Sequence, residues 1–155
     1  MRLVAQRVTS GSVTWEEAGA QRRAAIARGF VLLVGAGPDD DDATIRRMAD
    51  KVIDLRVFAD EAGKMNLSLT DVGGAALVVS QFTLFADMSR GRRPSFLGAG
   101  DPKRAEDGYL TFVQRFHERG IETQTGSFGA EMTVGIENEG PVTLVLSSDD
   151  WPTRV

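Results

Sequence analysis

The stretch AALVVSQFTLF, residues 75–85, decides how this chain folds. It begins with a continuous apolar run, which is typical of a buried strand. It then becomes polar at Ser80, Gln81 and Thr83, where a central strand should stay apolar. We therefore predict a strand over residues 75–85 and single out its polar interruption.

Working outward from this stretch, shorter patterns of β type recur along the chain. An apolar run covers residues 30–35, and strict alternation marks the segments after residue 131. The further predicted strands cover residues 2–8, 12–15, 30–35, 56–58, 132–136 and 142–146. Turns are predicted at Ser10-Gly11, at residues 60–63 and at Asn138-Glu139-Gly140-Pro141.

Two helices separate these strands. Residues 40–54 follow a run of aspartates and carry apolar residues at helical spacing. The second helix follows a predicted loop at residues 87–100. It starts at Asp101-Pro102, a cap and first-turn proline in their preferred places, and stops at Gly120. Its predicted buried stripe consists of Tyr109, Phe112, Val113 and Phe116. No linker divides the chain. We predict one α+β domain in which a mixed or antiparallel, barrel-like sheet wraps around a core shared with two main helices.

Composition excludes several classes of function. The chain has 155 residues, with 42% hydrophobic and 26% charged, as in ordinary globular domains. It has no cysteine, which excludes disulfides and thiol nucleophiles and suits a cytoplasmic protein. No apolar run is long enough for a membrane span or a signal peptide. The net charge of −4 disfavours a general nucleic-acid coat, so any RNA contact must be local.

Familiar catalytic groups are scarce. His117 is the single histidine, and no Gly-x-Ser-x-Gly elbow accompanies it, so we interpret it as a helix-surface residue. Zinc needs several His or Cys ligands, and the acidic run Asp39 to Asp42 lacks the alternation of a calcium loop. We expect no metal and no cofactor. An enzyme built this way would rely on positioning, backbone donors or a group supplied by the substrate.

Two segments stand out, SQFTL at 80–84 and NEGPVT at 138–143, and together they resemble the signature motifs of the D-aminoacyl-tRNA deacylases, also called D-tyrosyl-tRNA deacylases. Three further stretches are similar to that family: GKMNLS at 63–68, GRRPSF at 91–96 and TGSFGAEM at 125–132. Gln6-Arg7-Val8 matches its N-terminal strand. The resemblance covers residues 1–146, which we predict to be the catalytic domain, with a tail at 147–155.

The resemblance assigns chiral selection to Gly140 and Pro141, with Arg7 as their brace. It implies that the Gly140–Pro141 bond is cis and enters the active site of a partner subunit, where it leaves no room for an L side chain. From sequence alone, the plain alternatives are that Pro141 only shapes a turn and that Arg7 is a surface charge on an edge strand.

The same resemblance places Ser80, Gln81, Phe82 and Thr83 at the scissile ester. Thr83 is either a nucleophile or a group that positions water or ribose, and an ordinary strand threonine is the plain alternative. Phe128 and Met132 would bind the terminal adenine, although Met132 also fits core packing.

The implied protein is a cytoplasmic, metal-free homodimer. It would hydrolyse D-aminoacyl-tRNA and mischarged glycyl-tRNA, with assistance from the 2′-hydroxyl of the terminal adenosine. The alternatives are a non-catalytic module that binds the tRNA 3′ end and an interaction domain in which Gly140-Pro141 only shapes a turn. The best basic cluster consists of Arg90, Arg92 and Arg93. It either binds phosphates of the acceptor end or is a solvated loop.

Overall fold

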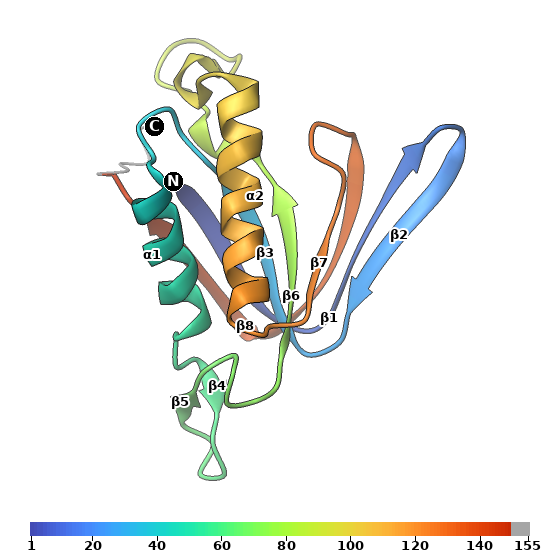
Figure 1. Ribbon diagram of the computed structural model, residues 1–155, viewed down its shortest axis with the longest axis vertical. Helices are drawn as coiled ribbons and strands as arrows, with labels where there is room; N and C mark the ends of the chain where they lie inside the picture. Colours follow the sequence, from blue (N-terminus) through green and yellow to red (C-terminus); the bar gives the residue numbers. More distant parts are fainter. Residues whose placement is uncertain (150–155) are drawn as a thin grey trace.

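The computed structural model describes residues 1–149, and its sheet is built around one long strand (Figure 1). This strand, β1 (Arg2–Glu17), pairs along its first half with β3 (Gly29–Gly35) and along its second half with β2 (Ala20–Ile26). β8 (Met132–Ser147) pairs with the other edge of β1. All three pairings are antiparallel, so β1 links most of the sheet.

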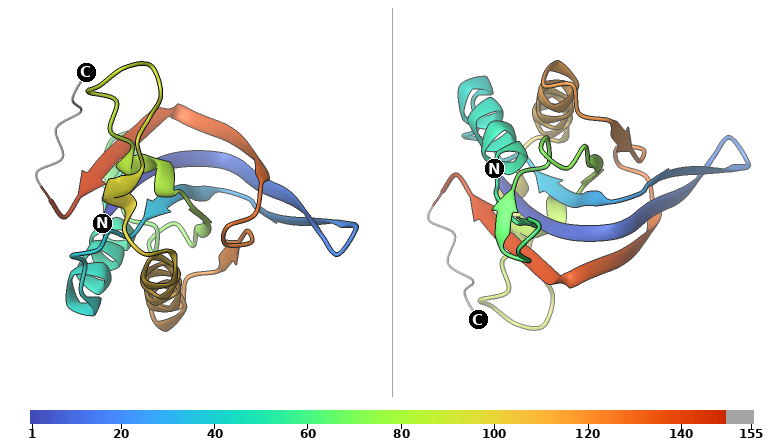
Figure 2. Two further views of the ribbon diagram at one scale, coloured as in Figure 1. Left: turned by 90° about the horizontal axis from the view of Figure 1, so that it is seen from above. Right: turned by 90° about the horizontal axis from the view of Figure 1, so that it is seen from below.

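Parallel pairing extends the sheet beyond β3. β6 (Ala75–Ser80) lies parallel to β3, and β7 (Thr123–Thr125) lies parallel to β6. The strand order is β2-β1-β3-β6-β7, with β8 on β1. Figure 2 shows this sheet curling into an almost closed barrel. The predicted α+β fold with a mixed, barrel-like sheet is therefore confirmed. β4 (Phe58–Ala59) and β5 (Met65–Leu67) form a separate small sheet.

The two predicted helices are present, and their caps explain where they start. α1 (Asp42–Ile53) begins after Asp41, whose carboxylate accepts from the Thr44 N–H at 2.8 Å. α2 (Pro102–Glu118) begins after Asp101, which accepts from the Arg104 N–H at 3.0 Å. The helices lie side by side over one face of the sheet (Figure 1).

Two hydrophobic clusters hold these layers together. The larger cluster lies between the helices and the sheet and includes the fully buried Phe30, Phe112 and Phe116. The smaller cluster lies inside the curl of the sheet and includes Val13 and Leu77. The apolar stripe predicted for the second helix is buried, as expected.

The predicted turn at Ser10-Gly11 is wrong, because β1 continues through it. A Cβ on Gly11 would lie 2.5 Å from Cγ2 of Val31, so this glycine permits close packing within a strand. The real hairpin turn is Ala18-Gly19, where φ is 51° and 76°. A positive φ at both positions matches the tight turn between two twisted strands.

The predicted turn at Asn138 to Pro141 is also wrong, since β8 runs through these residues. The pairing of β8 with β1 shifts register between Gln6 and Val8 and again between Val8 and Ser10. Asn138 Nδ2 donates to the Arg7 carbonyl at 2.8 Å and to the Val142 carbonyl at 3.0 Å. The segment is therefore a bulge, and the Asn138 side chain satisfies one backbone carbonyl on each of the two strands, β1 and β8.

The strand predicted over residues 75–85 stops at Ser80. The Gln81 N–H still donates to the Val34 carbonyl at 2.8 Å, and the chain then turns into a 3₁₀ helix, η1 (Phe82–Phe85). The buried Phe85 ring anchors this turn. The polar residues thus mark the end of the strand and not its middle.

Ser147 is the last residue of β8, and the Ser148 N–H donates to the Met1 carbonyl at 2.9 Å. The rest of the predicted tail, residues 150–155, lies outside the described residues, and the domain boundary at residue 146 stays a prediction. None of the helices in the described part of the chain is both long and apolar enough to span a membrane.

Candidate active site

A cavity of about 530 Å³ opens where the parallel strands β3 and β6 end. Its walls come from the ends of these strands, the start of α2, and the segment that leads into β8. Its size suits a nucleoside or another small molecule. The residues that line the cavity include Gly35, Ser80, Gln81, Phe82, Phe96, Phe128 and Met132.

Ser80, Gln81 and Phe82 reach the cavity because β6 ends there. A Cβ on Gly35 would lie 2.9 Å from the Gln81 carbonyl oxygen, so glycine allows the two chain segments to approach. The Phe82 ring is 57% exposed and meets the Phe96 ring edge-on at 5.1 Å. The two rings form an apolar lip at the mouth of the cavity.

The same turn offers backbone donors. The first N–H groups of a helix have no partner within the helix. Among the described residues, no backbone acceptor contacts the N–H groups of Phe82 and Thr83. Free N–H groups at a cavity can stabilise an oxyanion, which is the chemistry expected for ester hydrolysis.

Phe128 and Met132 form the opposite wall. The Phe128 ring packs against Tyr109 with ring centroids 5.8 Å apart. The Tyr109 hydroxyl donates to the Val78 carbonyl at 2.8 Å, and burial raises the pKa of Tyr109 well above its usual value. Tyr109 therefore stays protonated and joins Phe128 to β6, two residues before Ser80.

Thr83 is directed elsewhere. It lines a second cavity of about 750 Å³ on the other side of η1, together with Asp39, Asp40 and Asp149. Its hydroxyl oxygen accepts a hydrogen bond from Gln81 Nε2. An amide nitrogen is no base, so this contact orients the hydroxyl without activating it.

Arg7 lies within the bulge of β8. Its side chain is 10% exposed, its Nε lies 3.1 Å from Oε2 of Glu139, and its Nη1 donates to the Val57 carbonyl. The Arg7–Glu139 contact is an ion pair without hydrogen-bond geometry, since both atoms lack a hydrogen-bond partner. A Cβ on Gly140 would lie 3.0 Å from Arg7 Nη2, so Arg7 packs directly against the glycine.

The Gly140–Pro141 bond is cis, and both residues are exposed. Strand register places them far from the cavity of their own chain. Arg7 pairs with Phe30 and Phe30 with Ala76, whereas Ser80 pairs with Val34. Four residues of strand, about 13 Å, separate Ala76 from Ser80. Within one chain, the structure does not bring Arg7, Gly140 and Pro141 to the cavity.

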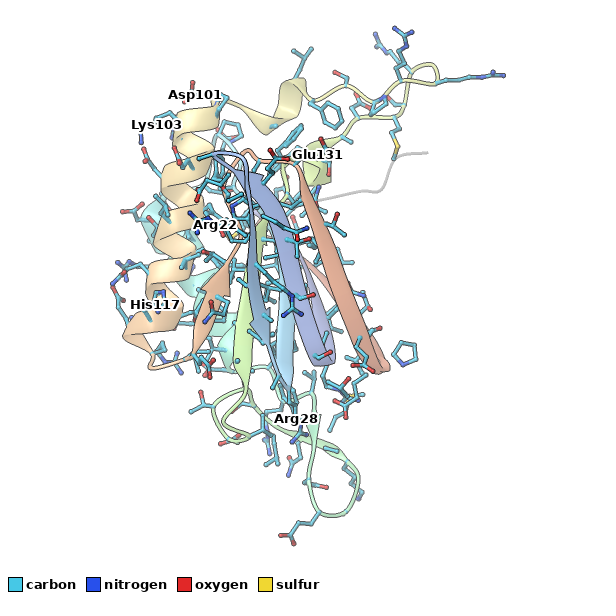
Figure 3. The ribbon with its side chains drawn as sticks, turned by 90° about the vertical axis from the view of Figure 1, so that its right-hand side faces the viewer. Arg22, Arg28, Asp101, Lys103, His117 and Glu131 are labelled. Carbon is cyan, nitrogen blue, oxygen red and sulfur yellow. The ribbon has the colours of Figure 1, made fainter. Side chains whose placement is uncertain are left out.

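Charged groups are absent from the lining of the first cavity within residues 1–149. Over the same residues, no three His, Cys, Asp or Glu side chains converge to form a metal site. Figure 3 shows Asp101 and Glu131 at one end of the molecule and His117 at the far end of α2. His117 is exposed, as interpreted from the sequence.

Sequence reasoning missed two aromatic residues of the site. Tyr109 was assigned only to the buried stripe of the second helix, and Phe96 only to a loop. Their ring contacts join residues that are distant along the chain, since Phe82 and Phe96 are 14 positions apart and Tyr109 and Phe128 are 19. The apolar type of Phe96 in a loop rich in glycine and arginine was the available signal.

Comparisons with known proteins agree along the whole chain. A family model described as D-Tyr-tRNA(Tyr) deacylase matches residues 4–147. A D-aminoacyl-tRNA deacylase of Sorangium cellulosum is 51% identical over 149 residues, 96% of this chain and 97% of the relative. One of Thermoanaerobacter pseudethanolicus is 48% identical over 148 residues, again 96% and 97% of the two chains.

Two solved structures share the fold. The c-Myc DNA unwinding element binding protein superposes with a TM-score of 0.86 at 39% identity, over 96% of this chain and 99% of that one. A protein described as a probable eukaryotic D-amino acid tRNA deacylase superposes with a TM-score of 0.80 over 94% and 97% of the two chains. At 17% identity, the second shows the fold alone. On the family model and the curated relatives, this chain belongs to the D-aminoacyl-tRNA deacylase family, whose members are hydrolases of ester bonds.

Proposed function

We propose that this protein hydrolyses the ester that joins a D-amino acid to the 3′ end of tRNA, as the names of its relatives describe. One observation carries the proposal. A single cavity brings Ser80, Gln81 and Phe82 together with Phe128 and Met132, residues from two distant parts of the chain. These are the segments that the resemblance assigns to the ester and to the terminal adenine.

In this proposal, the terminal adenosine occupies the cavity. Adenine stacks against Phe128 and Met132, as aromatic and sulfur-containing side chains favour for an unpaired base. The ester carbonyl then lies at the start of η1. The backbone N–H of Phe82, which lines the cavity and donates to no backbone acceptor among the described residues, then stabilises the oxyanion that forms when water attacks the carbonyl carbon. The bond to the 3′ oxygen breaks, and that oxygen takes up a proton.

Chiral selection requires a second copy of the chain, since Gly140 and Pro141 lie far from their own cavity. In a homodimer, the exposed bulge of one subunit would enter the cavity of the other. Arg7 would hold the bulge in shape through its contact with Gly140. The exposed Ile136 and Val145 of β8 support burial of this strand against a partner. A wall of backbone excludes an L side chain and admits a D side chain or glycine.

Within the part of the chain that the structure describes, no side chain that lines the cavity can act as a general base, which supports assistance by the substrate itself. We propose that the 2′-hydroxyl of the terminal adenosine activates or positions the attacking water. Thr83 then only positions neighbouring groups, because its hydroxyl is held by the Gln81 amide. This reaction needs no covalent enzyme intermediate.

Hydrolysis of D-tyrosyl-tRNA and L-tyrosyl-tRNA tests the proposed activity. We expect kcat/KM to favour the D substrate by about 100-fold or more, equal to about 2.7 kcal/mol of transition-state free energy. Glycyl-tRNA should be hydrolysed as well. Equal rates for both enantiomers contradict chiral selection. Binding of tRNA 3′ ends without any turnover would instead favour a non-catalytic binding module.

A substrate that ends in 2′-deoxyadenosine tests the mechanism. We expect its hydrolysis to slow by about 100-fold or more, as for loss of a general acid–base group. The Thr83→Ala variant should keep most of its activity and show no burst of product. A burst in the wild-type protein that Thr83→Ala removes would instead identify Thr83 as a nucleophile.

A further inference from the structure

A basic loop follows η1 and has no role in the hydrolysis proposed above. It covers residues 86–96 and contains Arg90, Arg92 and Arg93, all exposed. An isolated bridge closes its base, where Asp87 and Ser95 exchange backbone hydrogen bonds of 2.8 and 2.9 Å. Among residues 1–149, no acidic side chain forms an ion pair with these three arginines.

The basic loop begins and ends at the cavity. Phe82, four residues before residue 86, lines the cavity, and so does Phe96 at the end of the loop. Their edge-on ring contact at 5.1 Å ties both ends of the loop to the cavity mouth. Figure 1 shows the loop projecting beyond the N-terminal end of α2, on the side where β6 ends. A ligand that fills the cavity and extends past this aromatic lip would therefore leave it beside the base of the basic loop.

The surrounding charges favour this direction for RNA. The neighbouring cavity, on the other side of η1, is lined by Asp39, Asp40, Asp87 and Asp149. Arg2 and the N-terminal ammonium group also line this cavity and pair with Asp149 and Asp40, but the carboxylates outnumber these cations, and the whole chain carries a net charge of −4. Three arginines within four positions, none of them in an ion pair with an acidic side chain of residues 1–149, outnumber the one carboxylate of the loop, Asp87, and provide the local positive charge that a phosphate backbone requires.

We propose that the basic loop binds phosphates of the tRNA acceptor strand just before the terminal adenosine. The inference rests on the proposed function, because it places that adenosine in the adjoining cavity. The arginines then add affinity for RNA, whereas the cavity alone recognises the esterified adenosine. Binding is by charge to the backbone and carries no base specificity.

The test compares two substrates and three variants. The substrates are full-length D-tyrosyl-tRNA and 3′-D-tyrosyl-adenosine, which lacks every acceptor-strand phosphate. The loop variant is Arg92→Gln/Arg93→Gln. A control of equal charge change, Arg47→Gln/Lys51→Gln, alters exposed residues of α1 that line neither cavity. Arg92→Lys/Arg93→Lys keeps the charge and should restore activity. Urea unfolding midpoints check that all variants fold equally well.

We expect the loop variant to raise KM for D-tyrosyl-tRNA about tenfold while kcat changes little, because it loses two phosphate contacts. The slope of log kcat/KM against log salt concentration should fall by about 1.4, or about 0.7 per contact. Hydrolysis of 3′-D-tyrosyl-adenosine should be unchanged. The α1 control should match the wild type on both substrates.

Two results would overturn the inference: an unchanged KM for the tRNA substrate, or an equal loss on both substrates, which would place the loop in the cavity itself. Failure of the proposed function gives a different pattern, in which the wild type hydrolyses neither substrate. Binding of deacylated tRNA at several salt concentrations then still tests the loop. Equal binding by the wild type and the loop variant would contradict the inference.

Discussion

The Gly140→Ala substitution adds one methyl group and tests whether the backbone at Gly140 and Pro141 excludes an L side chain. A Cβ there would lie 2.8 Å from Val142 Cγ2 and 3.0 Å from Arg7 Nη2, and φ is +119°, which L residues rarely adopt. Gly140→Ala must therefore displace Arg7 or the bulge. We expect kcat/KM for D-tyrosyl-tRNA to fall about 100-fold, as for a displacement of about 1 Å at a reacting centre. Circular dichroism should show a folded protein.

Gly19→Ala is the matched control for this change. Gly19 also has a positive φ, +76°, but a Cβ there meets nothing within 4 Å. It should lose stability by about 1 kcal/mol from backbone strain and keep full activity. If Gly140→Ala is as active as Gly19→Ala, the bulge has no part in chiral selection.

At the scale of elements, a network of charges joins α1 to α2. Asp50 on α1 accepts from Arg115 at 3.0 and 3.1 Å and from Arg119 at 2.7 Å. The hydrogen bonds from Arg115, above all, lower the pKa of Asp50 from its usual 3.8. The folded state thus binds fewer protons than the unfolded state near that pH, so this stabilisation is present above pH 3.8 and is lost as pH falls through the lowered pKa.

Asp50→Asn should reduce the free energy of unfolding by about 1 kcal/mol at pH 7, a value kept low because the pairs are about one-third exposed. Urea unfolding from pH 7 to pH 3 should show this difference beginning to shrink below about pH 4. Asp107→Asn removes the exposed pair with Lys103 and should cause no measurable change. A difference that persists unchanged at pH 3 would contradict a charge-dependent role for Asp50.

Tyr109 connects α2 to β6 and to the wall of the cavity. Tyr109→Phe removes the only hydroxyl that donates to the Val78 carbonyl within the described residues and keeps the ring against Phe128. A buried carbonyl that loses its donor should cost about 1 to 2 kcal/mol in urea unfolding. KM should stay within about twofold of the wild type, since the ring contact remains. A large rise in KM with unchanged stability would show that the hydroxyl itself acts on the substrate.

At the scale of the whole molecule, Gly140 lies far from the cavity of its own chain, and this separation predicts complementation between subunits. Gly140→Ala alters the bulge, and Phe82→Ala alters the cavity lip, so each homodimer should be impaired. A mixed dimer holds one site with an intact cavity and an intact partner bulge. After equal mixing and subunit exchange, activity should recover to about one quarter of the wild-type value, given twofold symmetry.

No recovery, in a sample whose subunits exchange, would mean that each chain builds its site alone. Sedimentation of the wild-type protein provides the accompanying check, since a monomer at assay concentration would contradict the proposed homodimer. Labelled subunits report exchange independently of activity. The two measurements together separate a failed assembly from a failed assignment of the bulge.

The sequence by itself determined the features that depend on near neighbours. The aspartates at 39–42, the cap at Asp101 and apolar spacing predicted both helices, and the apolar run from residue 75 predicted the central strand, although not its end at Ser80. These signals are local, because a helix start or an apolar stripe depends on a few adjacent residues. The family motifs likewise supplied candidate site residues, one by one, without their distances, and their roles stay predictions.

The tertiary structure alone decided how those residues meet. It made Gly11 a packing contact with Val31, turned Thr83 away from the cavity, and set Phe128 across from Phe82. It also placed Gly140 far from the cavity of the same chain, through the registers of three strand pairs, β8–β1, β1–β3 and β3–β6. Register and cavity walls arise from contacts between residues far apart in the chain, and no local pattern encodes which strands meet or how far they slide.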